Sequence, residues 1–179
     1  MTKSEIEKEL SSQGEFVQLD HLIDFIKENI PTDVRKFAML KIAEIYDKKM
    51  MFTEAAKIYN NLAIILMPFK DKITYHIKEA EMYIKSGVLR EADYAMQKAM
   101  TQANTFEKND IKFSIKQFYK RQAEIYEKEL RRNNAVKMYE KLLEISATEA
   151  EKREYKAKLL PLYERLGKFR EYNALKEMR

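Results

Sequence analysis

The sequence predicts an all-α protein made of repeated helical hairpins, and three observations carry that prediction. The tetrapeptide Ala-Glu-Ile-Tyr at 43–46 returns as Ala-Glu-Met-Tyr at 80–83, as Ala-Glu-Ile-Tyr at 123–126, and weakly as Leu-Pro-Leu-Tyr at 160–163. The chain of 179 residues contains only three Gly and three Pro. It has no run in which β-branched and polar residues alternate, as they do in half-buried strands.

Residue types also recur at fixed distances from the four tyrosines. Small residues lie three positions before the first three tyrosines and nine positions after them: Ala43, Ala80, Ala123, Ala55, Ala92 and Ala135. The position four residues after each tyrosine holds Met50, Gly87, Leu130 or Gly167. Glycine tolerates the left-handed conformation that ends a helix, so this position predicts a turn. A hairpin cannot bury its apolar face alone, so neighbouring hairpins must stack.

The pattern of small residues, Tyr, Gly, Ala and a large apolar residue resembles the tetratricopeptide repeat. The resemblance implies a right-handed α-α superhelix, or solenoid, of about five antiparallel helical hairpins in a single domain. It also implies a scaffold or adaptor whose concave groove binds a segment of another protein. The tyrosines are 37, 43 and 37 residues apart, against about 34 residues for the standard repeat, so the helices are expected to be longer.

The elements follow in order from this alignment. The predicted hairpins cover approximately 1–31, 32–68, 69–105, 106–146 and 147–179, and the first is a degenerate copy with Gly14 at the turn position and Pro31 at its end. The predicted helices are 3–12, 15–30, 33–50, 53–66, 70–86, 89–104, 110–130, 132–146, 148–166 and 169–178. Pro68 should end its hairpin, and Pro161 should kink a helix from inside. An irregular join is expected at 104–110, with Asn109 or Asp110 capping the following helix.

Composition limits where the protein resides. There is no cysteine, so a disulfide framework and a thiolate metal site are excluded. No stretch of 18 apolar residues is present and the first ten residues are polar, so we expect a cytoplasmic protein without membrane insertion or a signal peptide. The net charge of +5 is unevenly spread, with −4 in residues 1–30, +2 in 31–110 and +7 in 111–179.

Charged residues form a second pattern on the first helix of each hairpin. Basic residues lie five positions before and two positions after the tyrosines, and acidic residues lie two positions before the first three tyrosines. This pattern predicts a partner-binding groove in which an acidic row lies between two basic rows. Its residues are Lys41, Glu44, Lys48, Lys78, Glu81, Lys85, Arg121, Glu124, Lys128, Lys158 and Arg165. Such a groove would take an extended or helical segment that carries acidic side chains. The same spacings also make helix-stabilising ion pairs on a solvated face, and this alternative stays open.

Two other functions also stay open. The basic run at 112–132, interleaved with aromatic residues, is the leading alternative and would bind RNA through phosphate contacts and base stacking. Because Lys112, Lys116 and Lys120 are four apart, they are expected to form one solvated stripe. The third reading is a self-assembly module that pairs its uncapped C-terminal hairpin as a homodimer. Tyr172, Leu175 and Met178 in this hairpin are expected to pack inward, to meet a partner or to dimerise.

Catalysis is not expected from this sequence. His21 and His76 are the only histidines, and neither has a cluster of metal-ligand residues at a usual spacing. The chain has no glycine-rich phosphate loop and no nucleophile–base set. We therefore expect no enzymatic activity, no metal and no cofactor.

Overall fold

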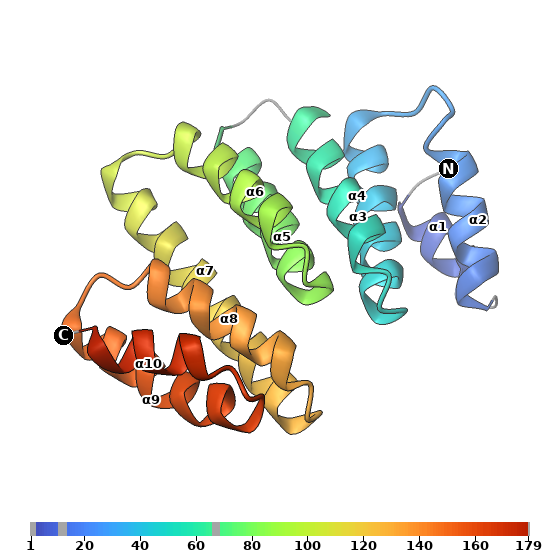
Figure 1. Cartoon of the computed structure of the whole chain (residues 1–179). Coiled ribbons are helices and arrows are strands. Elements are labelled where there is room, and N and C mark those ends of the chain that lie inside the picture. The colour runs from blue at the N-terminus through green and yellow to red at the C-terminus, as the bar shows by residue number, and fades with distance from the viewer. Residues whose placement is uncertain (1–2, 11–13, 66–68, 179) are drawn as a thin grey trace. The chain divides into compact units, whose positions relative to one another are not determined.

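The computed structural model describes residues 3–10, 14–65 and 69–178, and within these ranges the chain is all-helical, with ten helices and no strand (Figure 1). Two compact units are present, Met1–Ile111 (unit 1) and Lys112–Arg179 (unit 2). The first six helices are α1 Lys3–Leu10, α2 Glu15–Phe25, α3 Thr32–Lys48, α4 Phe52–Ile65, α5 Phe69–Ser86 and α6 Leu89–Gln102. The remaining four are α7 Thr105–Lys128, which crosses the unit boundary, α8 Arg132–Glu144, α9 Glu149–Arg165 and α10 Phe169–Glu177.

Unit 1 packs its helices in chain order, with α3 between α2 and α4 and with α5 between α4 and α6. The buried alanines explain the close packing, because Ala43 and Ala55 are fully buried and let the backbones of α3 and α4 approach. Large apolar residues fill the remaining space, and the core residues around α4 are Met39, Tyr59, Leu62, Tyr75 and Met82. A second cluster joins α1, α2 and α3 through Ile6, Leu19, Leu22, Val34 and Ile42.

Unit 2 repeats this arrangement with α9 packed on α8 and α10. Ala123 and Ala135 are fully buried, like their counterparts in unit 1. The large core residues include Tyr126, Tyr139, Leu142, Tyr155, Leu159 and Tyr163. The small residues that the sequence pattern singled out therefore lie in the core of both units.

The four predicted turns share one hydrogen-bonded geometry. Met50, Gly87, Leu130 and Gly167 have positive φ angles of 59°, 78°, 59° and 67°. In each turn the N–H of the next residue donates to the carbonyl of the repeat tyrosine, as Met51 does to Tyr46 at 2.8 Å and Lys168 to Tyr163 at 2.9 Å. The N–H of the left-handed residue donates to the carbonyl one position after the tyrosine. This is the Schellman motif, and it confirms the alignment on the four tyrosines.

Corresponding residues of the two units are 80 positions apart. Tyr126 and Tyr163 follow Tyr46 and Tyr83 by 80 residues. Several contacts recur at this distance. The rings of Tyr59 and Tyr75 are stacked with centroids 6.3 Å apart, and those of Tyr139 and Tyr155 are 6.5 Å apart. Lys36 pairs with Asp71 at 3.0 Å, and Lys116 pairs with Glu151 at 2.8 Å. Units 1 and 2 thus contain two internal copies of a two-hairpin segment.

The predicted join at 104–110 is wrong, because the extra residues extend α7 to Thr105. Asn104 caps this helix. Its side-chain Oδ1 accepts from the Glu107 N–H, and the Glu107 carboxylate accepts from the Asn104 N–H, both at 2.9 Å. This reciprocal pair satisfies two N–H groups at the helix start, so the helix begins earlier than Asn109 or Asp110 would allow. The proposed caps Asn109 and Asp110 are exposed residues inside α7.

The N-terminal hairpin also differs from its prediction. Helix α2 ends at Phe25 rather than Ile30, and the Arg35 guanidinium donates to the Glu28 carbonyl at 2.8 Å in the segment that follows. Ile30 precedes a proline and is biased towards extended backbone, which shortens the helix. Gly14 is the N-cap of α2 and has φ −67°, so it lacks the left-handed conformation of the other turn residues. Pro31 lies at the N-cap of α3, where the sequence placed a boundary.

The two remaining prolines have different outcomes. The predicted end of a hairpin at Pro68 lies outside the described residues. Pro161 lies inside α9 with an exposed side chain, and the helix continues beyond it to Arg165.

Candidate functional site

The predicted groove residues of α3 line a hollow on unit 1. The hollow has a volume of about 290 Å³ and is lined by Glu15, Gln18, Lys41, Glu44, Ile45 and Lys48. Its charges are matched within the chain. Lys41 pairs with Glu44 at 3.2 Å, and Lys48 pairs with Glu15. The pKa of Glu15 is lowered by hydrogen bonds from Lys48 and Lys49, so this carboxylate stays ionised.

The groove residues of α5 are also paired. Lys78 donates to Glu81 at 2.9 Å, and Lys85 reaches across to Asp47 on α3 at 2.7 and 2.9 Å. Glu81 is buried, whereas Glu44 is exposed. The predicted acidic positions therefore differ in solvent access, and the predicted basic groove residues of unit 1 are held by carboxylates of the same chain.

Unit 2 presents a different surface. Arg121, Glu124 and Lys128 are exposed on α7, and the Arg121 guanidinium lies 5.9 Å from the centroid of the Phe118 ring. Lys158 and Arg165, from α9, line a hollow with a volume of about 340 Å³, which we call the unit 2 hollow. Its lining residues are Glu127, Leu130, Arg132, Lys158, Pro161, Leu162 and Arg165.

The unit 2 hollow contains three cations and one carboxylate. The Lys158 amine donates to Glu127 at 3.3 Å and lies 5.9 Å from the centroid of the Tyr139 ring. Arg132 and Arg165 have no ion-pair partner among the described residues. Burial and the nearby Glu127 both raise the pKa of Tyr139, so its hydroxyl stays neutral. Two guanidinium groups are therefore available to an anion from outside the chain.

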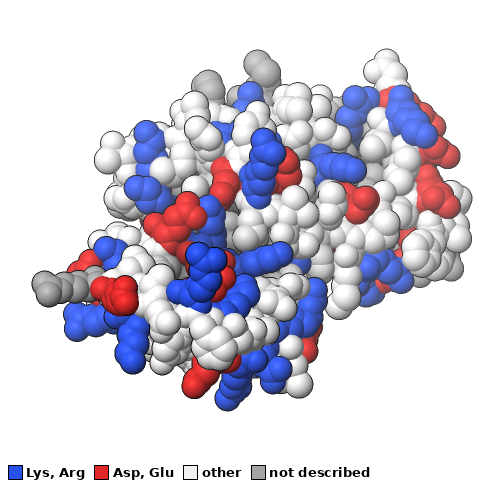
Figure 2. Space-filling view, viewed as in Figure 1, with Lys and Arg blue, Asp and Glu red and all other residues white. Residues whose placement is uncertain are grey.

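A second hollow adjoins the first at the turn between α7 and α8. It has a volume of about 410 Å³ and shares Leu130 and Arg132 with the unit 2 hollow. The remaining lining residues are Arg131, Asn133, Asn134 and Leu166. Leu130 is 69% exposed between them. Figure 2 shows both signs of charge spread over the visible face of the molecule, with Lys and Arg prominent over the part that α8–α10 occupy in Figure 1.

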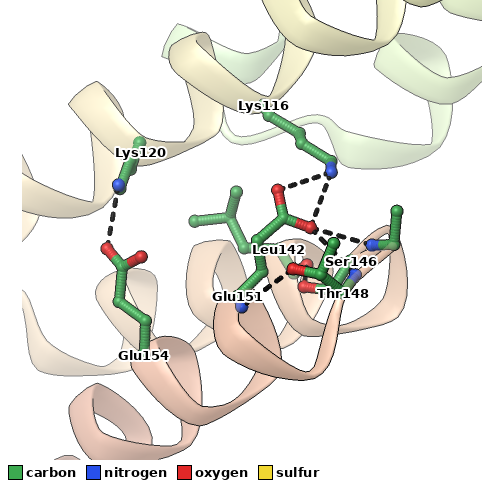
Figure 3. A network of polar contacts seen from close by, with 8 residues as sticks. Lys116, Lys120, Leu142, Ser146, Thr148, Glu151 and Glu154 are labelled. Atoms are coloured by element: carbon green, nitrogen blue, oxygen red, sulfur yellow. Dashed lines mark hydrogen bonds and ion pairs between the residues drawn. The ribbon is translucent and has the colours of Figure 1, made fainter.

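The predicted solvated lysine stripe on α7 is wrong for two of its three members. Figure 3 shows Lys116 and Lys120 directed from α7 towards Glu151 and Glu154 of α9, with N–O distances of 2.8 Å in both pairs. The Lys116 side chain is only 16% exposed. Lys112 is exposed. The four-residue spacing places the lysines on one face of α7, but α9 covers part of that face.

Glu151 has two structural roles in this contact. Its carboxylate accepts from Lys116 and from the N–H groups of Ala147 and Thr148, while its own N–H donates to the Thr148 hydroxyl (Figure 3). The Lys116 amine and these N–H groups lower the pKa of Glu151. One carboxylate thus caps α9 and ties it to α7.

Sequence reasoning missed a buried polar network in unit 1. Glu79, which is almost fully buried, accepts from Lys98 at 2.7 and 2.8 Å and lies 2.9 Å from Nδ1 of His76. Lys98 also donates to the Asn60 side chain at 2.8 Å. The network joins α4, α5 and α6. His76 and Glu79 are three residues apart on one helix, but no spacing in the sequence indicates that Lys98 from another helix completes the network.

The described residues set limits on other chemistry. Among residues 3–10, 14–65 and 69–178, no group of three or more His, Cys, Asp or Glu side chains could hold a metal ion. No helix in the described part of the chain is long and apolar enough to cross a membrane.

Comparison with known proteins leaves the family open. No protein-family model matches the chain, and it matches neither a curated protein nor a solved structure.

Proposed function

We propose that the chain is a tetratricopeptide-like helical-repeat protein, a right-handed solenoid of stacked hairpins that binds a segment of another protein and performs no catalysis. The observation that carries this proposal is the recurrence of one turn geometry at Met50, Gly87, Leu130 and Gly167. Hairpins that repeat in phase present equivalent residues at regular intervals on their first helices.

The mechanism that we propose is pre-organisation. The first helices are fixed by the Schellman turns and by ion pairs to the next hairpin, such as Lys85–Asp47 and Lys116–Glu151. A partner segment would therefore meet side chains that lose little further conformational freedom on binding. The residues that line the hollows on α3, α7 and α9 would make the contacts.

RNA binding through the α7 stripe is the weaker alternative. Lys116 and Lys120 are occupied by Glu151 and Glu154, so phosphate contacts there would have to replace two existing ion pairs. Self-assembly through the last hairpin has less support at Leu175, which packs inward within unit 2 as one of the expected alternatives, whereas Met178 is exposed.

Site-specific photo-crosslinking in a lysate tests the proposal. A photoreactive residue at Glu44 or Glu124, both exposed on first helices, should give discrete protein adducts that persist after nuclease treatment. The same residue at Lys57 or Lys137, both exposed on second helices, is the matched control and should give few adducts. Adducts that disappear with nuclease would replace the proposal with RNA binding. Adducts of the bait with itself would replace it with self-assembly.

A further inference from the structure

We infer that the unit 2 hollow is the receptor for an acidic segment of a partner protein, one in which carboxylates flank an apolar side chain. The inference rests on the proposed function and adds the chemistry of the partner and the residues that select it. Arg132, Lys158 and Arg165 would take the carboxylates, and Leu130, Pro161 and Leu162 would take the apolar side chain.

The internal copy in unit 1 has a balanced set of charges at the equivalent place in the fold. The residues 80 positions earlier than the lining of the unit 2 hollow are Asp47, Met50, Phe52, Lys78, Glu81, Met82 and Lys85. Here each cation has its own carboxylate, with Lys85 on Asp47 and Lys78 on Glu81. The Phe52 ring lies 5.6 Å from the Lys85 amine. Two cations and two carboxylates cancel, and every charge is satisfied within the chain.

Two substitutions between the copies remove that balance. Pro161 stands where unit 1 has Glu81, so Lys158 has no carboxylate three residues further along its own helix and pairs with Glu127 instead. Arg132 stands where unit 1 has Phe52, which adds a cation. Glu127, the counterpart of Asp47, pairs with Lys158. Arg165 therefore lacks the carboxylate partner that its counterpart Lys85 has. The result is a hollow with two unpaired guanidinium groups.

The lining favours a peptide over other anions. Arginine forms two parallel hydrogen bonds with a carboxylate, so two arginines in one hollow suit acidic side chains. The apolar lining residues Leu130, Pro161 and Leu162 offer contact to an apolar side chain, which a free inorganic anion cannot use. No aromatic side chain lines either of the adjoining hollows among the described residues, so base stacking has no platform there. The second hollow adds room beside the first for a segment longer than one side chain.

Peptide binding to the full chain tests this inference. The probe is a short fluorescein-labelled peptide with Glu and Asp on both sides of one Leu, and the comparison peptide carries Gln and Asn instead. Fluorescence anisotropy should show that the acidic peptide binds and that the comparison peptide does not. The double variant Arg132→Phe with Pro161→Glu restores the unit 1 residue types and should weaken binding by about tenfold or more, because an arginine contact is lost and a carboxylate is added.

The control is Lys137→Glu, which makes the same change in net charge at an exposed position of α8 outside the hollow. It should leave affinity within about twofold, since exposed charges outside the contact are largely screened at physiological salt. Circular dichroism checks that each variant is folded. In a backbone-amide NMR titration, the resonances of Leu130 and Leu162 should shift with the acidic peptide.

Several outcomes would overturn the inference. Equal weakening by both variants would reduce the effect to net charge, and equal binding of the amide peptide would remove the role of carboxylates. Displacement by inorganic phosphate would indicate a simple anion site, and tighter binding of polyuridine than of peptide would favour RNA. If protein adducts form at Glu124 but the acidic peptide does not bind, this inference fails while the proposed function stands. If no protein adduct forms at all, the proposed function itself fails.

Discussion

Met50 and Leu130 adopt the left-handed conformation that glycine adopts at the equivalent turns. Both have φ 59°, and their side chains are 77% and 69% exposed. The left-handed conformation costs a non-glycine residue roughly 1–2 kcal/mol. Neither side chain recovers that energy by burial in the core, so the Schellman hydrogen bonds and the packing of the flanking helices must hold these residues in place.

The substitution Met50→Gly should therefore stabilise the protein. We expect the free energy of unfolding to rise by about 0.5–1 kcal/mol, since relief of backbone strain exceeds the greater flexibility of glycine in the unfolded chain. Urea denaturation measures the change. The control is the opposite kind of change at an equivalent turn, Gly87→Ala, which should lower the free energy of unfolding. An unchanged or lower stability of Met50→Gly would show that the Met50 side chain makes a favourable contact.

At the residue scale the sequence predicted backbone roles better than side-chain partners. The turn positions and the buried alanines follow from a fixed distance to a tyrosine, because backbone geometry repeats with the hairpin. The partners of Glu79 and Lys116 lie 19 and 35 residues away on other helices. A charge pattern on one helix cannot show which neighbour will cover it, so the pattern predicts a solvated Lys116, whereas the Lys116 side chain is mostly buried.

Helix α7 shows how an element boundary is set by a capping residue. The apolar pattern could not separate a helix starting at Thr105 from one starting at 110, since residues 104–110 are almost entirely polar. The reciprocal hydrogen bonds between Asn104 and Glu107 decide the question. The sequence contains the signature of this cap, an Asn followed three residues later by a Glu. Asn109 is a second residue that could cap a helix, so the sequence alone does not decide where α7 begins.

The substitution Asn104→Ala should destabilise the protein, whereas Asn109→Ala should not. Loss of the cap leaves the Glu107 N–H without its acceptor, which costs about 1 kcal/mol in comparable helices. Asn109 lies inside α7 and is exposed, where alanine is a better helix former. Thermal or urea unfolding of the two variants separates them. Equal effects would mean that α7 begins later than Thr105 in solution.

The contact between α7 and α9 should weaken in acid. Because the pKa of Glu151 is lowered in the folded state, its ionised form contributes stability above the unfolded pKa near 4.5, and this contribution is lost as the pH falls through the folded value. In Glu151→Gln the free energy of unfolding should depend less on pH below about pH 5 than in the wild-type protein. Urea titrations at several pH values measure the slope.

The substitution Lys116→Met tests whether the Lys116 amine causes this pH dependence. If the Lys116 amine is the main reason for the low pKa of Glu151, then Lys116→Met should flatten the same part of the pH profile, and the double variant should flatten it no further. Additive effects of the two substitutions would assign the pH dependence to other groups.

On the scale of the whole molecule, the two units reuse the same tyrosine pair. The pairs Tyr59–Tyr75 and Tyr139–Tyr155 each join the second helix of one hairpin to the first helix of the next. Double-mutant cycles with leucine at both positions should give coupling energies of about 0.5–1.5 kcal/mol in each unit. Similar values would show that the two interfaces are energetically equivalent. Coupling in only one unit would limit the equivalence to sequence and geometry.

The all-helical fold and the hairpin register were predictable because both are periodic. The single domain and the superhelix remain predictions, since they depend on contacts between elements that lie far apart in the chain. The proposed binding hollow could be anticipated only in part. Lys158 and Arg165 belong to the predicted groove, but Arg132 is the first residue of the second helix α8, and its importance depends on the absence of a carboxylate at position 161.

The distance of 80 residues between equivalent contacts is what a tandem duplication of a two-hairpin segment would leave behind. In this history, the extra residues at the start of α7 mark the junction between the copies. The two copies differ at the turn and on the following first helix. One has a closed set of charges, and the other has Pro161 in place of a glutamate and Arg132 in place of a phenylalanine. Two substitutions in one copy of a duplicated segment would thus suffice to create a binding specificity, while the other copy supports the fold.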